Sequence, residues 1–600
     1  MATAQHTFHI PVMGIGYTID SPARVAMYGI TSVISLVDDI LIEKMREYHS
    51  KKRNKKFRPI SNKVNDFRAK RITAYLDLMD EVVDEKFEEL KESAQNRGDE
   101  IKKYLQMLPD QSALKTKFSE LTEEYDIGKA WNWLKDHITP GKIDVNIMTK
   151  LDRPNYKGKE KLSSEYSDAH AALRGFAKST LDASVVLSAG MNPRLYGYMQ
   201  EFPDFYPDES GNLKKRIILK VSDYRSALIQ GKYLAKKGLW VSEYRVESGL
   251  NCGGHAFATD GYLMGPILEE FKNKRTELRE TVHALYCDAL EKRGNSVPET
   301  PHEVRITAQG GVGTAGEHQF LQDQYGVDSV GWGTPFLLVP EAVNIDTNTM
   351  HLLENAEEDD LYLSDISPLG VPFNSVRGNT KDIEKEDRIA AGRPGSPCPK
   401  KYVSLSTEFT EKPICKASRQ YQYLKLQELE EENLEPTEYD KTYDSIVEKS
   451  CICVGLGTAA LLANNLDTRI EGEGVSICPG PNMAYFSEEV PLQTMVNHIY
   501  GKSDILSRKD RPHMFLKELG LYVDYLKTQL ADNADSMDEK QQKYLESFRD
   551  NLLDGIDYYR NLFGQADFPQ NNGAATIFDG LDSFEEELKT LPIQQFAPAE

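Results

Sequence analysis

Eight short runs rich in β-branched and other apolar residues are spread over the first 338 residues, and helical patterns separate most of them. The runs are 9–16, 29–37, 142–148, 183–190, 216–223, 238–248, 303–311 and 327–338. Eight strands with helices between them indicate a (β/α)8 TIM barrel, in which the chemistry lies at the C-terminal ends of the strands. A doubly wound open sheet is the competing topology, but it would place a glycine loop after its first strand rather than late in the chain.

The 600-residue chain is longer than one hydrophobic core usually organises, so additional units are expected. We assign 1–37 and 141–345 to the barrel, and the charged, helix-forming stretch 38–140 to a helical insertion after the second strand. Residues 346–600 form a C-terminal extension, predicted to be mostly helical. In the helix after the first strand, Ser21 is the expected N-cap and Pro22 the first helical residue.

The composition narrows the class of partner. A formal net charge of -22 argues against general binding to nucleic acid or anionic membrane surfaces, because the field of the protein repels a polyanion. Small molecules or proteins are the expected partners. Seven cysteines form a sparse, odd set, and the N-terminus lacks the pattern of a secretory signal, which favours the reducing cytosol. No apolar run approaches the roughly 20 residues of a membrane span.

Two glycine-rich sites follow the last two predicted strands. The first is ITAQGGVGTAGEH (306–318), with Gly310, Gly311 and Gly313, and the second is Gly333 in WGTPF. In phosphate-binding barrels, loops at these two places donate backbone N–H groups to a phosphate, with a helix N-terminus behind them. Tight turns are the alternative explanation for the same glycines.

His255 follows two glycines at the end of the sixth predicted strand, in ESGLNCGGHAF (247–257). A histidine at that position can reach a ligand in the barrel mouth, and its near-neutral pKa suits proton transfer. The alternative is a histidine that only hydrogen-bonds a loop.

These motifs together resemble the nitronate monooxygenase (2-nitropropane dioxygenase) family of FMN-dependent barrels and the related flavin-type enoyl-acyl carrier protein reductases. Cys252-Gly253-Gly254-His255 is similar to the family's Ala-Gly-Gly-His, and Gly310-Gly311-Val312 to its later glycine loop. GVDSVGWGTPFL (326–337) is similar to the family's Gly-Ala-Asp-Gly-Val-x-x-Gly-Thr-Arg-Phe-Leu, and HIPVMG to its first strand. The sequence departs from the pattern at Cys252, where alanine is usual, and at Pro335, where arginine is usual.

The resemblance implies that Gly311, Gly333 and Thr334 hold the phosphate of FMN, with Gly310 beside them. It also implies that Gly253 and Gly254 belong to the cofactor site.

For the flavin ring, the resemblance places Met13, Gly14 and Asn146 against the isoalloxazine and Lys220 at its polar edge, where a cation would stabilise negative charge on the reduced ring. Asn146 and Lys220 are equally consistent with structural polar residues of the barrel mouth.

The activity that the resemblance implies is oxidation of a small organic substrate, with His255 as the general acid/base and molecular oxygen or NAD(P)H as the second reactant. Nitronate monooxygenase is the nearest named activity. An NAD(P)H-dependent enoyl reductase, and a flavin-binding scaffold without turnover, are the alternatives.

Five of the seven cysteines fall within the C-terminal extension: Cys398, Cys415, Cys451, Cys453 and Cys478. Thiolates in such number can bind an iron–sulfur cluster or zinc, although no CxxC pair is present. Ordinary packing of small buried side chains is the competing explanation. The stretch SCICVGLGTAALL (450–462) is a candidate strand–turn–helix near the cofactor.

Overall fold

The computed structural model describes residues 5–93, 98–124, 127–188, 190–253, 259–532, 537–565 and 574–592. Its centre is a closed barrel of eight parallel strands in the order β1-β10-β9-β8-β7-β6-β3-β2. The barrel strands are β1 (Phe8–Ile10), β2 (Thr31–Ser35), β3 (Ile143–Ile147), β6 (Ala183–Leu187), β7 (Lys215–Val221), β8 (Val241–Glu247), β9 (Arg305–Gln309) and β10 (Ser329–Gly331). Each falls on one of the eight predicted runs, so the TIM barrel is confirmed and the open sheet is wrong.

Helices fill most of the connections between the strands. They are α1 (Pro22–Val25), α7 (Asp168–Ala177), α8 (Pro193–Tyr198), α9 (Tyr224–Ala235), α10 (Met264–Arg293), α11 (Ala315–Tyr325) and, after the last strand, α12 (Thr347–Glu354). A two-stranded hairpin, β4 (Tyr156–Lys157) and β5 (Glu160–Lys161), lies between β3 and α7. The expected N-cap role of Ser21 is wrong: its backbone is already helical, and its hydroxyl donates to the carbonyl of Ala342 at 2.6 Å.

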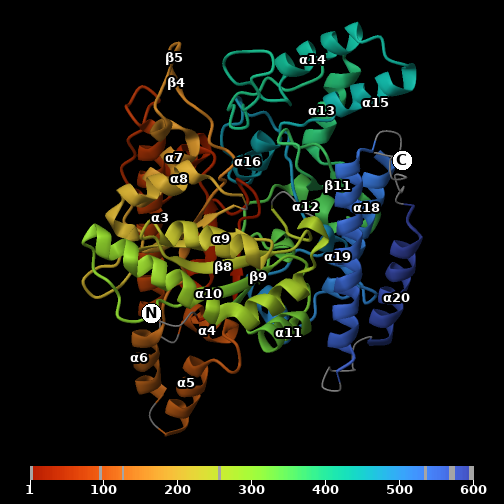
Figure 1. Cartoon of the computed structure of the whole chain (residues 1–600). Helices are drawn as coiled ribbons and strands as arrows, with labels where there is room; N and C mark the ends of the chain where they lie inside the picture. Colours follow the sequence, from red (N-terminus) through yellow and green to blue (C-terminus); the bar gives the residue numbers. More distant parts are fainter. Residues whose placement is uncertain are drawn as a thin grey trace.

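The segment between β2 and β3 is helical, as predicted. Its helices are α2 (Asp39–Lys52), α3 (Phe67–Ser93), α4 (Asp99–Met107), α5 (Ala113–Glu124) and α6 (Ile127–His137). Helix α3 packs against α2 and α7, whereas α5 and α6 project from one corner of the molecule (Figure 1).

The C-terminal extension is mostly helical and contains one hairpin, β11 (Leu361–Ser364) with β12 (Phe373–Val376). Its helices are α13 (Thr380–Ala390), α14 (Arg419–Glu431), α15 (Pro436–Val447), α16 (Ile452–Ala463), α17 (Leu492–Ile499), α18 (Met514–Asp532), α19 (Glu539–Phe563) and α20 (Ala574–Thr590). Figure 1 shows α18, α19 and α20 side by side along one flank, with α14 and α15 at another corner.

The stretch 450–462 folds differently from the expected strand–turn–helix. Its residues form the single helix α16, in which Ile452 to Leu461 are all buried. The backbone of Gly16, in the loop after β1, donates to the carbonyl of Leu456 at 2.8 Å. Helix α16 therefore packs onto the C-terminal rim of the barrel. Gly16 permits this approach, since a Cβ there would lie 2.9 Å from the carbonyl oxygen of Gly457.

One cluster of buried apolar side chains extends from Phe8 in β1 to Leu588 in α20, so the extension shares the hydrophobic core of the barrel. Among the described residues, no single helix combines the length and apolar character of a membrane span. The bent pair α15 and α16 meets that test only when both helices are counted together.

Apolar and charged side chains lie on different sides of the barrel interior. On one side, Val33, Val186 and Ile218 make a small apolar cluster of their own. On the other, Glu243 accepts from Arg245 at 2.6 Å and from Thr307 at 2.7 Å. Burial alone would raise the pKa of Glu243, but the neighbouring cations lower it to about 2. This carboxylate is therefore ionised inside the barrel.

Candidate active site

A cavity of about 110 Å³ lies at the C-terminal ends of the barrel strands. It is lined by four of the predicted cofactor residues: Gly14, Asn146, Lys220 and Gly253. They come from the loop after β1, from β3, from β7 and from the loop after β8. The barrel thus brings residues far apart in the sequence to one place, which we call the mouth cavity.

The C-terminal extension covers the mouth cavity with apolar side chains. The turn between β11 and β12 contributes Pro368, Leu369 and Val371, and α16 contributes Ile452 and Leu456. A polar floor under an apolar cover is typical of small-molecule sites, where few polar groups fix orientation.

Lys220 forms an ion pair with Glu247, the last residue of β8, at 2.9 Å. The same Oε1 of Glu247 accepts from Asn251 at 2.8 Å and from Gln309 at 2.5 Å. The cation predicted for this site is therefore balanced by a carboxylate that sequence reasoning missed. The alternation Glu243, Arg245, Glu247 in β8 was an available signal, because every second residue of a strand shares one face.

Asn146 is 6% exposed, and its Oδ1 has no hydrogen-bond partner among the described residues. A buried amide oxygen without a partner costs free energy in the folded protein. Since Asn146 lines the mouth cavity, this oxygen is available to a ligand with a hydrogen-bond donor.

The predicted phosphate residues lie at the ends of β9 and β10, which are neighbouring strands. Gly310 and Gly311 have φ values of +114° and +82°, which only glycine adopts without strain. The backbone N–H groups of Gly311, Gly333 and Thr334 donate to no acceptor among the described residues. Unpaired N–H groups on two adjacent loops are what an anion would require.

The helix behind these loops does not contribute as expected. At the N-terminus of α11, the carboxylate of Glu317 accepts from the backbone of Gly313 at 2.9 Å and of Thr314 at 3.2 Å. Its other oxygen is paired with Arg511 at 2.7 Å. A carboxylate of the chain itself thus occupies the N-terminus of α11, which leaves the glycine loops themselves as the candidate phosphate site.

A segment of the extension, 478–482, crosses the same loops. The hydroxyl of Thr334 donates to the carbonyl of Pro479 at 2.7 Å, and the backbone of Gly253 donates to that of Cys478 at 3.1 Å. Asn482 donates to the carbonyl of Gly311 at 2.7 Å. The side chain of Thr334 is therefore engaged, and its backbone N–H remains the group that can meet a phosphate.

Gly253 lies between the mouth cavity and the glycine loops. Its φ is +84°, and a Cβ there would lie 2.2 Å from the Cα of Met13. Met13 itself is fully buried and contacts the site through its backbone. The predicted Gly254 and the predicted general acid/base His255 lie outside the described residues.

Four of the candidate cysteines meet in space. The thiol of Cys398 lies beside those of Cys415 and Cys451, and the thiol of Cys451 lies beside that of Cys453. The fifth, Cys478, instead lies near Cys252, whose thiol donates to its carbonyl at 3.2 Å. None of these cysteines forms a disulfide. Among the described residues, no three His, Cys, Asp or Glu side chains are arranged to hold a metal ion.

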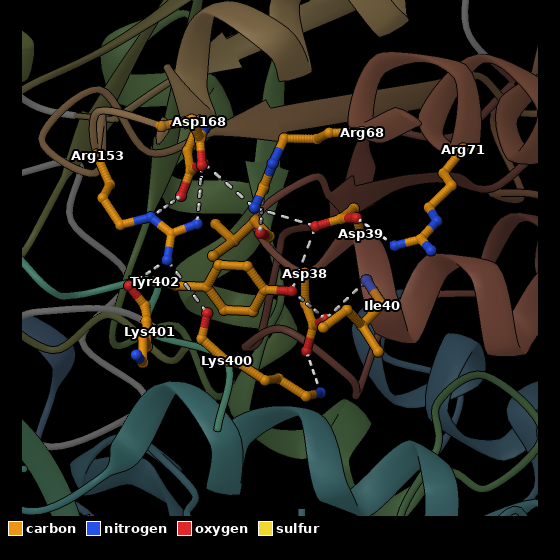
Figure 2. A network of polar contacts seen from close by, with 12 residues as sticks. Asp38, Asp39, Ile40, Arg68, Arg71, Arg153, Asp168, Lys400, Lys401 and Tyr402 are labelled. Atoms are coloured by element: carbon orange, nitrogen blue, oxygen red, sulfur yellow. Dashed lines mark hydrogen bonds and ion pairs between the residues drawn. The ribbon is translucent and has the colours of Figure 1, made fainter. Parts of the chain in front are cut away.

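A buried polar network anchors the cysteine-bearing loop to the barrel (Figure 2). Lys400 and Asp38 are both fully buried and form an ion pair at 2.5 Å. Tyr402 donates to the other oxygen of Asp38 at 2.8 Å, and the carbonyl of Lys401 accepts from Arg153 at 3.0 Å.

The insertion and the barrel join the same network. Arg68 bridges Asp39 at 3.0 Å and Asp168 at 3.2 Å, and Arg71 adds a further bond to Asp39 at 2.8 Å. Figure 2 shows these side chains converging from the insertion, the barrel and the extension. Buried charges of this kind hold the three segments in one arrangement, because removing one partner leaves another charge unpaired.

No protein-family model and no curated protein sequence matches the chain. A solved structure of nitroalkane oxidase from Streptomyces ansochromogenes aligns with 64% of this chain and 85% of its own, at 11% identity and a TM-score of 0.27. A likeness this weak carries no argument. The assignment of the barrel rests on the strand pairing described above.

Proposed function

We propose that this chain is an FMN-dependent oxidoreductase whose flavin ring lies in the mouth cavity. The observation that carries the proposal is the convergence of Asn146, Lys220 and Gly253 on one cavity, next to two glycine loops whose N–H groups are unpaired among the described residues. Both features support the site that the resemblance implies.

The residues present fit the polar groups of FMN. The partnerless Oδ1 of Asn146 would accept from the ring, and the Lys220–Glu247 pair offers a donor and an acceptor to its polar edge. The N–H groups of Gly311, Gly333 and Thr334 would hold the phosphate. FMN, when bound, supplies hydride transfer, and the protein supplies orientation and electrostatics.

The mouth cavity is small for a ligand of the size of FMN. At about 110 Å³ it is smaller than the roughly 300–1,000 Å³ of typical small-molecule sites. The turn between β11 and β12 covers the cavity without belonging to the barrel. FMN binding therefore requires this turn, or the cover around it, to move outward, after which the apolar side chains exclude water from the ring.

His255 is the proposed general acid/base. With FMN bound, this histidine would take a proton from the carbon beside the nitro group of a nitroalkane and so form the nitronate, which is then oxidised with molecular oxygen as the second reactant. Reduction of a conjugated alkene by NAD(P)H is the second candidate, and it uses the same proton donor.

The test is the visible spectrum of the purified protein, followed by identification of the flavin released on denaturation. Oxidised-flavin absorbance and released FMN are expected. Protein that stays colourless after incubation with FMN contradicts the proposal. Mixing the FMN-loaded protein without oxygen with a nitronate or with NADH then distinguishes the two reactions. Loss of flavin absorbance with the nitronate supports the monooxygenase, and loss with NADH supports the reductase. His255→Ala should retain FMN and lose turnover.

A further inference from the structure

From the positions of Cys398, Cys415, Cys451 and Cys453 we infer an iron–sulfur cluster site beside the mouth cavity. This inference goes beyond the proposed flavin chemistry. The four thiols reach one place from two segments of the extension: Cys398 and Cys415 lie in the connection between α13 and α14, and Cys451 and Cys453 lie at the start of α16. Their residues are between 2% and 5% exposed.

The local backbone is built to bring the four thiols together. Cys398 has a φ of +51°, an uncommon value for a residue with a Cβ. Ser396, two residues earlier, pairs with Ser418 in an isolated bridge, which brings the loop of Cys398 alongside that of Cys415. Lys400, two residues later, is tied to Asp38 in the network of Figure 2. Contacts on both sides thus fix the loop that carries Cys398.

Among the described residues, the arrangement of these thiols does not suit a single metal ion. One zinc ion needs four sulfurs at about 2.3 Å from one point. The described residues contain no such convergent group. The thiolates of an iron–sulfur cluster bind separate iron atoms, so they surround a larger group.

Three of the four cysteines line two different cavities. Cys453 lines the mouth cavity, whereas Cys398 and Cys415 line a separate cavity of about 970 Å³ on the far side. A cluster held by the four sulfurs would therefore lie between the proposed flavin and the second cavity.

The experiment uses the full-length protein, purified without air and reconstituted with ferrous iron and sulfide. We expect about two to four iron atoms and equal acid-labile sulfide per chain, with a paramagnetic signal after reduction by dithionite. One zinc per chain without sulfide, or no bound metal, overturns the inference.

Single variants locate the site. Cys398→Ser and Cys451→Ser should each lower iron and sulfide at least two-fold, whereas Cys287→Ser, in α10 and outside the group, should leave both unchanged. Iron retained in both cluster variants contradicts the assignment. FMN content of the variants reports on folding independently of the cluster.

A measurement on the unsubstituted protein keeps the inference testable if the variants fail to fold. All seven cysteines should react with a thiol reagent after the reconstituted protein is unfolded in chelator without a reductant. Fewer than seven reactive thiols would reveal disulfides in place of the cluster and would overturn it.

Discussion

Asn146→Val should change apoprotein stability and flavin affinity in opposite directions. The buried Oδ1 of Asn146 lacks a partner among the described residues, and such a group costs about 1–3 kcal/mol in the folded state. Valine removes this cost, has similar volume and suits the middle of a strand. The free energy of unfolding of the apoprotein should therefore rise by about 1 kcal/mol.

The same substitution removes the acceptor proposed for the flavin ring. One hydrogen bond contributes about 0.5–1.5 kcal/mol net, so FMN affinity should fall about two- to ten-fold. Urea unfolding of the apoprotein and fluorescence titration with FMN measure the two effects separately.

Ser32→Ala is the matched control. Its hydroxyl is also buried and without a partner among the described residues, but Ser32 lies at the start of β2, away from the mouth. This variant should gain stability and keep its FMN affinity. If Asn146→Val leaves FMN affinity unchanged, or lowers apoprotein stability, then Asn146 does not face the flavin as reasoned here.

Three further variants test the electrostatics. Lys400→Met should destabilise the protein by about 3–5 kcal/mol in thermal unfolding, and adding Asp38→Asn should recover part of the loss, because the first change alone leaves a buried carboxylate unpaired. Burial raises the pKa of Glu518 from 4.5 to about 7, so between these pH values the folded chain binds more protons than the unfolded chain. The free energy of unfolding should therefore fall as pH rises from about 4.5 to 7. Glu518→Gln should flatten this dependence on pH, and an unchanged slope would contradict the assignment. Glu247→Gln should raise the midpoint potential of the bound flavin by roughly 30 mV, the equivalent of 1.4 kcal/mol, because Lys220 loses its counter-charge. A lowered potential would show that the Lys220–Glu247 pair lies away from the ring.

The barrel could be read from the sequence because strand and helix signals are local. Short runs rich in β-branched and other apolar residues marked all eight strands. Local signals failed at α16, where Ile452 to Leu461 are buried on all sides, so no polar face reveals the helical period. They failed at Ser21 because its hydroxyl bonds Ala342, more than 300 residues away.

The resemblance to a family led to part of the site. It pointed to Gly14, Asn146, Lys220 and Gly253, which line the mouth cavity. Glu247 and Gln309 were missed although they lie within the motifs 247–257 and 306–318, because the interpretation of those motifs rested on their glycines and on His255. The crossing of segment 478–482 over the glycine loops depends on contacts between distant parts of the chain, which a single sequence does not encode locally. The role of His255 and the division of the chain at residues 38, 141 and 346 stay predictions.

Comparison of FMN with riboflavin, which lacks the phosphate, tests the central claim most directly. Charge-assisted hydrogen bonds are each worth about 1.5–3 kcal/mol, so the apoprotein should bind one FMN about ten-fold or more tightly than riboflavin. Gly333→Val, which places methyl groups near Cys252 at the proposed anchor, should reduce that preference toward unity. Equal affinity of the native protein for both ligands, or no binding of either, would contradict a flavin anchored between β9 and β10.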